Sequence, residues 1–256
     1  MARDLELRSE SWRAMVSPER GGRLRWWGEA GAGGREPWIR PMLLERGRMV
    51  GGCMARMAVP SLADPEDLAR APDPAMLDEP WQLAQRTMDT VTLMQHHRGP
   101  SPGTWGYQAS QTLRLQQNRL EWTLSMRNLG RHPMPVRLGW RLQFAEDFAR
   151  ELVLDEDCRL VQPARGHVES LETWRGLATL AGPGGRHVLL RGDPPVTTLD
   201  FERHPTRASL HLDLMTPGGE ALAPLPRGEE LTLRLTLDLM VAKRPPPTGR
   251  PAPTLL

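Results

Sequence analysis

Apolar residues recur at every second position along much of the chain, which is the spacing of β-strands that bury one face. The clearest case is residues 136–144, VRLGWRLQF, where an apolar face alternates with Arg137, Gly139, Arg141 and Gln143. The same alternation predicts strands at four further places, within residues 5–16, 90–94, 210–214 and 231–239. Helical spacing is scarce, so the pattern predicts an all-β chain.

Residues 113–126 predict a β-hairpin. Leu113 and Leu115 alternate with polar residues before the polar run 116–119, QQNR, and apolar alternation resumes from Leu120 to Met126. Two alternating segments joined by a short polar turn are typical of paired antiparallel strands. With 24 glycines and 25 prolines available for turns, many short strands of this kind predict a sandwich or a barrel.

Two segments lack strand alternation. Residues 61–78, SLADPEDLARAPDPAMLD, are rich in proline and aspartate and predict a long surface loop. Residues 242–256, AKRPPPTGRPAPTLL, have the composition of an extended tail. We therefore expect one domain over residues 1–241, followed by a proline-rich disordered tail over 242–256.

Composition narrows the possible partners and compartment. A formal net charge of +2 over 256 residues gives no reason to expect a nucleic acid or an anionic membrane. Only Cys53 and Cys158 are present, which favours a reducing compartment over a disulfide framework. The first residues lack the apolar region of a secretory signal, and no apolar run approaches the length of a membrane helix. These features predict a cytoplasmic protein.

The stretch from Trp105 to Phe144 resembles the central block of the aldose 1-epimerase (galactose mutarotase) family. The shared features are the strand ladder, the Pro133-Met134-Pro135 entry and the closing Phe144. Similar short motifs follow the family's order, at PERGGRLRWW (18–27), Pro80-Trp81, TWRG (173–176) and PRGEE (226–230). The resemblance implies a galactose mutarotase-like β-supersandwich of large antiparallel sheets.

The resemblance also implies a chemistry, in which an acid and a base open a sugar ring at the anomeric centre. The position of the family's acid histidine is Arg141, whose guanidinium keeps its proton and so cannot act as an acid. The position of the family's base is Asp213, our candidate catalytic base, and a shifted alignment offers Glu202 instead. Arg141 either points into a cleft and binds an anionic group of the substrate or is a surface arginine paired with an acidic residue such as Glu146. We carry it as a candidate substrate-binding residue.

A second family histidine aligns with Asp73, inside the proline-rich loop, and the family's asparagine–arginine pair aligns near Ser61. None of these family residues is retained. Loop 64–78 folding over the site would bring in Asp73 or Asp78 as a replacement acid, and we count Asp73 among the candidate substrate-binding residues.

Nine tryptophans accompany a single tyrosine, and tryptophan faces commonly stack on sugars. Trp81, Trp105 and Trp174 lie near expected loops and are candidate cleft-rim residues, whereas Trp122 and Trp140 lie on apolar strand faces and are expected in the core. His211 shares a strand face with Asp213. The two form either an orienting pair in the site or part of a solvated sheet face.

No metal or cofactor is predicted. His96 and His97 are adjacent on a strand and point to opposite faces, with no further ligand at metal-binding spacing. Gly21-Gly22 and residues 31–34 lack the strand-then-helix context of a phosphate-binding loop.

The sequence therefore predicts a carbohydrate-binding protein of the aldose 1-epimerase family, acting on the anomeric centre of an aldose. One variant takes an anionic or phosphorylated sugar, because arginine suits phosphate or carboxylate groups. The alternative is a catalytically inactive member that serves as a sugar-binding or protein-interaction module. Nothing in the sequence specifies an oligomeric state.

Overall fold

The structure is a computed structural model that describes residues 4–30, 39, 43–45, 48–59, 79–97, 105–145, 151–154, 159–161, 168–171, 173–182, 185–203, 209–217 and 223–241. The expected loop 61–78, with Asp73, and the expected tail 242–256 lie outside the described residues. The described part of the chain forms strands in four antiparallel sheets and a single 3-10 turn.

The largest sheet has nine strands in the order β13-β12-β15-β16-β19-β10-β9-β8-β7. Its centre is built from the longest strands, which pair in continuous antiparallel register from β16 to β8. The strands are β7 (Gln82–Arg86), β8 (Thr90–His97), β9 (Tyr107–Gln116), β10 (Arg119–Asn128), β12 (Glu151–Leu154), β13 (Arg159–Val161), β15 (Leu177–Ala181), β16 (Arg186–Gly192) and β19 (Glu230–Val241).

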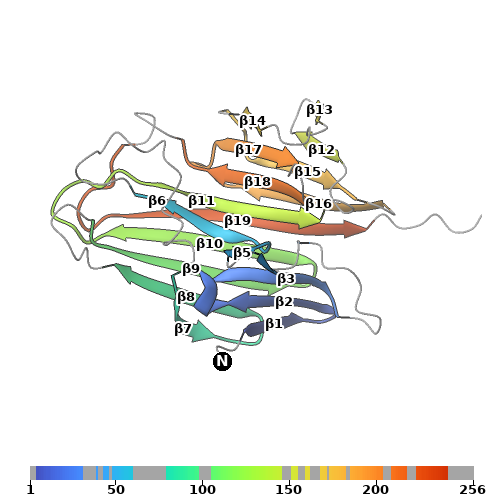
Figure 1. Ribbon diagram of the computed structural model, residues 1–256, viewed down its shortest axis with the longest axis horizontal. Coiled ribbons are helices and arrows are strands. Elements are labelled where there is room, and N and C mark those ends of the chain that lie inside the picture. The colour runs from blue at the N-terminus through green and yellow to red at the C-terminus, as the bar shows by residue number, and fades with distance from the viewer. Residues whose placement is uncertain are drawn as a thin grey trace, which may run out of the picture.

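A five-stranded sheet lies over the large one (Figure 1), in the order β14-β17-β18-β11-β6. Its strands come from distant parts of the chain, so the sheet brings together side chains that are more than half the sequence apart, such as Arg56 and Asp213. They are β6 (Met54–Ala58), β11 (Arg137–Ala145), β14 (Val168–Leu171), β17 (Thr198–Arg203) and β18 (Ser209–Met215).

A third sheet closes one side of the sandwich. It comprises β1 (Leu5–Ser9), β2 (Trp12–Ser17) and β3 (Arg23–Glu29), with the 3-10 turn η1 (Pro18–Arg20) between β2 and β3. An antiparallel bridge between Leu24 and Cys53 ties β3 to the residue before β6, and the Arg8 N–H donates to the Met88 carbonyl. A separate pair consists of β4 (Leu43–Glu45) and β5 (Arg48–Val50).

The predicted alternation is confirmed. Trp140 on β11 and Trp122 on β10 are fully buried between the two large sheets, with the leucines of β18 and β19 around them. The predicted hairpin is β9–β10, and its turn includes Gln117 with a positive φ of 50°. Because strand side chains alternate, burial of one face of β11, β17 and β18 directs their remaining side chains away from the core.

Cys53 shows how closely this core is packed. Its side chain is fully buried, and burial raises the pKa of the thiol to about 12, although the backbone N–H of Gln143 partly opposes that rise. The thiolate is the reactive form of cysteine, so a buried thiol with this pKa is inert near neutral pH.

No helix in the described part of the chain is long and apolar enough to cross a membrane.

We predict that native Cys158→Ser protein does not react with Ellman's reagent at pH 8, and that one thiol per chain reacts once the protein is unfolded by denaturant. The Cys53 pKa is higher in the folded state than its ordinary 9.0, so this group also makes stability fall as the pH rises from about 9 to 12. Fast thiol reaction in the native Cys158→Ser protein would contradict this packing.

Candidate functional site

The outward face of the five-stranded sheet carries polar side chains where its inward face carries the core. Residues directly opposite in antiparallel register have Cβ atoms about 4.5–5.5 Å apart, and successive residues on one face are about 7 Å apart along the strand. The register across β11, β18 and β17 therefore sets up two neighbouring rows of polar residues. We call this surface the polar face; one row is Arg141, Asp213 and Asp200, and the next is Gln143, His211 and Glu202.

Asp213 is held by two arginines. Arg141 donates from Nε to Oδ1 at 2.7 Å and from Nη2 to Oδ2 at 2.5 Å, which is a bidentate pair. Arg56 donates from Nη1 to Oδ2 at 2.6 Å. The side chains of Arg56 and Asp213 are each 12% exposed and that of Arg141 is 33% exposed. We refer to these three residues as the Asp213 clamp.

The clamp depends on Gly139. Arg56 lies on β6 and Asp213 on β18, so the Arg56 side chain must cross the intervening β11. The residue opposite Arg56 on β11 is Gly139, which has no side chain to block that path. A Cβ there would lie 1.9 Å from the Leu214 carbonyl oxygen, so glycine is required at this close approach between strands.

The two guanidinium groups of the clamp have different environments. Burial lowers the pKa of Arg56, and the Asp213 carboxylate opposes that effect. The side-chain hydrogen bond with Asp213 raises the pKa of Arg141, and Glu202 and Asp200 add to the rise. Both arginines stay charged. The pattern places Asp200 and Glu202 close enough to Arg141 for their negative charges to act on it.

A cavity of about 130 Å³ opens on the polar face. Both rows contribute to it, together with Val168 on β14, whose side chain is 55% exposed at the rim. His211 is oriented within this cavity by the fully buried Ser209, whose Oγ lies 3.1 Å from Nε2 of the imidazole. The residues that line the cavity are Arg141, Val168, Asp200, Phe201, Glu202, His211 and Asp213.

Two buried polar atoms near the cavity, on residues that do not line it, have no hydrogen-bond partner in the described part of the structure. They are Nε of Arg56, a donor, and Oε1 of Gln143, an acceptor. An unsatisfied buried polar atom costs about 1–3 kcal/mol, so such atoms need an explanation. They are two of eight such atoms among the described residues, several of them in the core, so by themselves they do not mark a ligand site.

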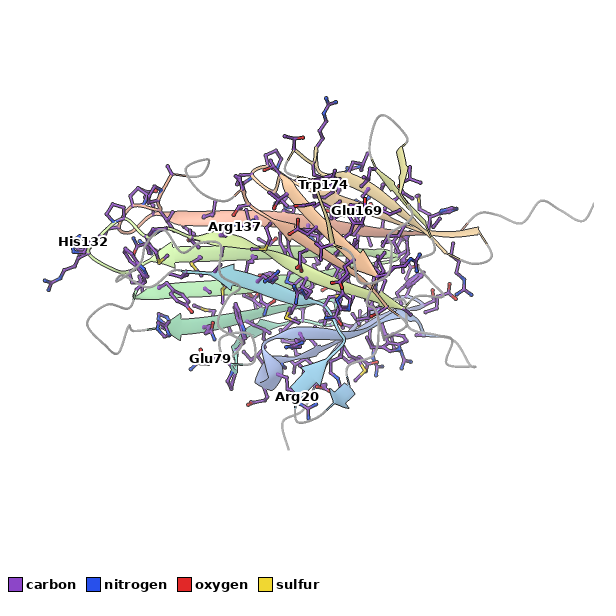
Figure 2. All side chains as sticks on the ribbon, turned by 45° about the horizontal axis from the view of Figure 1, so that its top comes forward. Arg20, Glu79, His132, Arg137, Glu169 and Trp174 are labelled. Atoms are coloured by element: carbon purple, nitrogen blue, oxygen red, sulfur yellow. The ribbon has the colours of Figure 1, made fainter. Side chains whose placement is uncertain are left out.

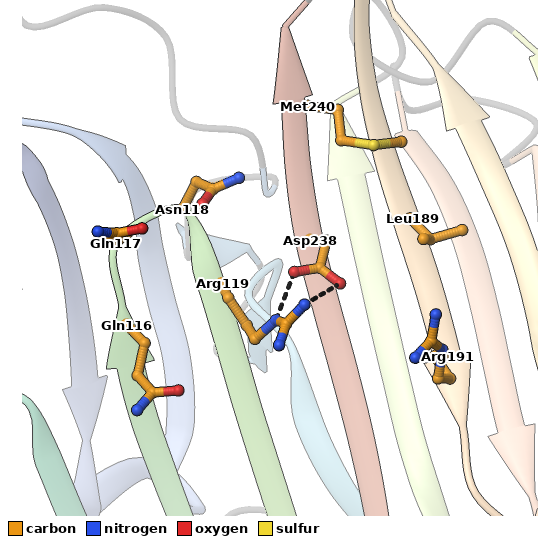
Figure 3. Close-up of a pocket in the computed structure, with 8 residues that line it drawn as sticks. All are labelled: Gln116, Gln117, Asn118, Arg119, Leu189, Arg191, Asp238 and Met240. Atoms are coloured by element: carbon orange, nitrogen blue, oxygen red, sulfur yellow. Dashed lines mark hydrogen bonds and ion pairs between the residues drawn. The ribbon is translucent and has the colours of Figure 1, made fainter.

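A larger cavity of about 560 Å³ lies on the outer face of the nine-stranded sheet (Figure 3). The β9–β10 turn forms one side of it and β16 the other, with an ion pair between Arg119 and Asp238 at 2.6 and 3.2 Å. None of the sequence-predicted site residues lines this cavity. The Arg119–Asp238 pair lies away from the polar face and has the same bidentate geometry as the Arg141–Asp213 pair.

No protein-family model and no curated protein sequence matches the chain. Solved structures do match it. A galactose mutarotase-like protein from Lactobacillus casei superposes with a TM-score of 0.71 over 93% of this chain and 100% of that chain, at 14% identity. A galactose mutarotase related enzyme from Lactobacillus acidophilus gives a TM-score of 0.70 over 94% and 98% of the two chains, at 11% identity.

An aldose epimerase homologue from C. elegans gives a TM-score of 0.64 over 95% of this chain and 100% of that chain, at 9% identity. The chain has the galactose mutarotase-like fold. The predicted fold class is thus confirmed by three structures that span nearly the whole chain. At these identities the likeness establishes the fold alone.

The mutarotase-like fold brings together three of the residues that the sequence singled out. Arg141, Asp213 and His211 line one cavity, and Glu202, the alternative base, lines it too. The three predicted rim tryptophans lie elsewhere, in the core: Trp81 is 4%, Trp105 7% and Trp174 4% exposed. Trp174, labelled in Figure 2, donates from Nε1 to the Leu177 carbonyl at 2.9 Å.

Sequence reasoning missed Arg56 and Asp200. Arg56 does carry a signal, because it is the single charged residue in the apolar run 53–59, CMARMAV. A charge inside an apolar strand needs a partner, but alternation alone does not say which strand provides it. Asp200 carries no such signal, and only the β17–β18 register places it beside Asp213. Among the described residues, no group of three or more histidine, cysteine or acidic side chains is arranged to hold a metal.

We predict that Asp213→Asn destabilises the mutarotase-like fold, because it leaves Arg56 and Arg141 without the carboxylate they share. Removing one partner of a buried ion pair costs about 3–5 kcal/mol, and the partial exposure of Arg141 reduces this to about 2–3 kcal/mol. Arg56→Met keeps the bidentate pair and is expected to cost less than half as much. Urea unfolding of the two variants measures both values; equal stability of Asp213→Asn and wild type would contradict the clamp.

Proposed function

We propose that the chain is a carbohydrate-binding member of the aldose 1-epimerase family that binds a neutral aldose on the polar face and acts on its anomeric centre. The single observation that carries this proposal is the cavity lined by Arg141, Asp213, Asp200, Glu202 and His211 on the five-stranded sheet of a galactose mutarotase-like fold.

The side-chain types of the cavity suit a sugar. A hydroxyl group is at once a donor and an acceptor, so vicinal hydroxyls pair well with carboxylates and guanidinium groups fixed side by side. The Asp213 clamp is such a fixed arrangement, since three hydrogen bonds hold its members in place.

The charge balance favours a neutral sugar over an anionic one. The described residues that line the cavity include one arginine, Arg141, and the three carboxylates Asp200, Glu202 and Asp213. Arg56 and Arg137 lie next to them, and with these two arginines the charges sum to zero. Arg141 already donates two hydrogen bonds to Asp213, and Arg137, labelled in Figure 2, donates to the Thr216 carbonyl at 3.2 Å. A phosphate would therefore compete with Asp213 for its arginine and would face Asp200 and Glu202.

A second candidate function is sugar binding without catalysis. The observation that favours it is the clamp itself, because all three described hydrogen bonds to Asp213 come from charged donors. Both carboxylate oxygens are occupied by these bonds, so a sugar hydroxyl would have to displace a guanidinium group to reach them. On this candidate, the polar face keeps its affinity for hydroxyl groups and the ring-opening step is absent.

The test combines binding with catalysis. Isothermal titration calorimetry measures affinity for methyl α-galactoside and methyl α-glucoside, whose anomeric centres cannot react, and for galactose 6-phosphate. Polarimetry follows freshly dissolved α-D-galactose and α-D-glucose. We expect wild type to bind the neutral glycosides more tightly than the phosphate and to accelerate mutarotation. Asp213→Asn should weaken binding by about 10- to 100-fold, the loss expected for a charged hydrogen-bond partner.

Asp238→Asn is the matched control, because Asp238 also forms a bidentate pair with an arginine, on the outer face of the other sheet. Its affinity and rate should equal those of wild type. Binding without acceleration would select the second candidate. Absence of binding to every sugar would overturn both, and equal losses in Asp213→Asn and Asp238→Asn would place the ligand elsewhere.

A further inference from the structure

We infer that His211 and Glu202 form the proton-transfer pair of this site, with His211 as the acid and Glu202 as the base, and that Asp213 is a positioning residue. This inference rests on the proposed mutarotase function. It assigns an acid to a site whose family position for that group is occupied by Arg141, and it chooses between the two carboxylates that the sequence leaves open.

The clamp removes Asp213 from proton transfer. Both of its carboxylate oxygens accept hydrogen bonds from guanidinium groups, one on Oδ1 and two on Oδ2. To take a proton from a sugar hydroxyl, the carboxylate would have to give up at least one charge-assisted bond, which is among the stronger kinds of hydrogen bond. Asp213 instead fixes Arg141 and Arg56 beneath the ligand.

Glu202 and His211 are placed together for proton transfer. They are directly opposite in the β17–β18 register, so their Cβ atoms are about 4.5–5.5 Å apart. Both line the cavity and both are partly exposed within it. Because the anomeric hydroxyl and the ring oxygen share one carbon atom, an acid and a base side by side can reach both oxygens of the same sugar.

The surroundings of His211 hold the imidazole in place. On its own strand, Ser209 Oγ lies 3.1 Å from Nε2, and Asp213 lies two residues further along. Gln143 faces it from β11 and Glu202 from β17. Arg141, one row away, lies near enough to Glu202 for the two charges to interact.

The step is balanced in protons and electrons. The Glu202 carboxylate takes the proton of the anomeric hydroxyl, the C1–ring oxygen bond breaks as the C1 carbonyl forms, and the His211 imidazolium gives its proton to the departing ring oxygen. After rotation about C1–C2, the ring oxygen attacks the other face of the carbonyl. It returns its proton to the imidazole as the new anomeric oxygen takes the proton from Glu202. Both side chains end as they began.

The experiment compares His211→Gln, Glu202→Gln and Asp213→Asn by polarimetry, with affinity for methyl α-galactoside measured in parallel. General acid or base catalysis contributes about 10²- to 10⁴-fold, so each of the two glutamine variants should lose that much kcat while its affinity for the glycoside changes by less than about fivefold. His211→Gln should also change the pH dependence of kcat/KM, because a glutamine has no proton to give. Glu202→Asp should recover part of the rate, since it keeps a carboxylate.

The outcomes separate this inference from the proposed function. Loss of kcat in both glutamine variants with glycoside binding kept, and with Asp213→Asn impaired mainly in affinity, supports the pair. Wild-type rates in His211→Gln or Glu202→Gln, with active and sugar-binding wild type, overturn the pair alone. Wild type that binds the glycoside without accelerating mutarotation overturns the pair and leaves the binding function. Wild type that does neither overturns both.

Discussion

The ion pairs around Asp213 are the interaction on which the polar face depends. They join β6, β11 and β18, three strands that are distant in the sequence, through one carboxylate. Two arginines this close would repel each other, and burial would further disfavour the charge on Arg56, so neither is tolerable there without Asp213. The carboxylate thus sets where both guanidinium groups lie.

The core and the candidate site are two sides of the same strands. On β11 and β18 every second residue is packed against the nine-stranded sheet, which leaves no freedom for the intervening residues to turn elsewhere. A one-residue slip of register would bury the arginines and expose Trp140 and Leu212. The burial of the apolar face therefore specifies the site's geometry, and Gly139 completes it by leaving a path for Arg56.

How much the sequence predicts depends on whether a feature is local. The β9–β10 hairpin and the face carried by β11 follow from alternation over a few residues, so both are predictable and both are confirmed. The strand order of the five-stranded sheet depends on pairing between distant segments, so it is not predictable from local alternation. The partner of Arg56 and the position of Asp200 follow from that order and are therefore not predictable either. The exposure of the tryptophans near expected loops is also not predictable from local sequence. A residue close to a turn in sequence can still be buried, and Trp81 and Trp174 are each 4% exposed.

The resemblance leads one to expect a histidine at position 141. The arginine found there removes a candidate acid and also occupies the Asp213 carboxylate. An imidazole would engage Asp213 through a single nitrogen, whereas the guanidinium of Arg141 engages both carboxylate oxygens from the adjacent strand. Arg141 and Asp213 are coupled through this pair, so the residue at position 141 also decides which hydrogen bonds Asp213 accepts. If ring opening persists in this chain, its proton transfers have to move to groups outside the clamp, and the adjacent row with His211 and Glu202 is the nearest place where both kinds of group meet.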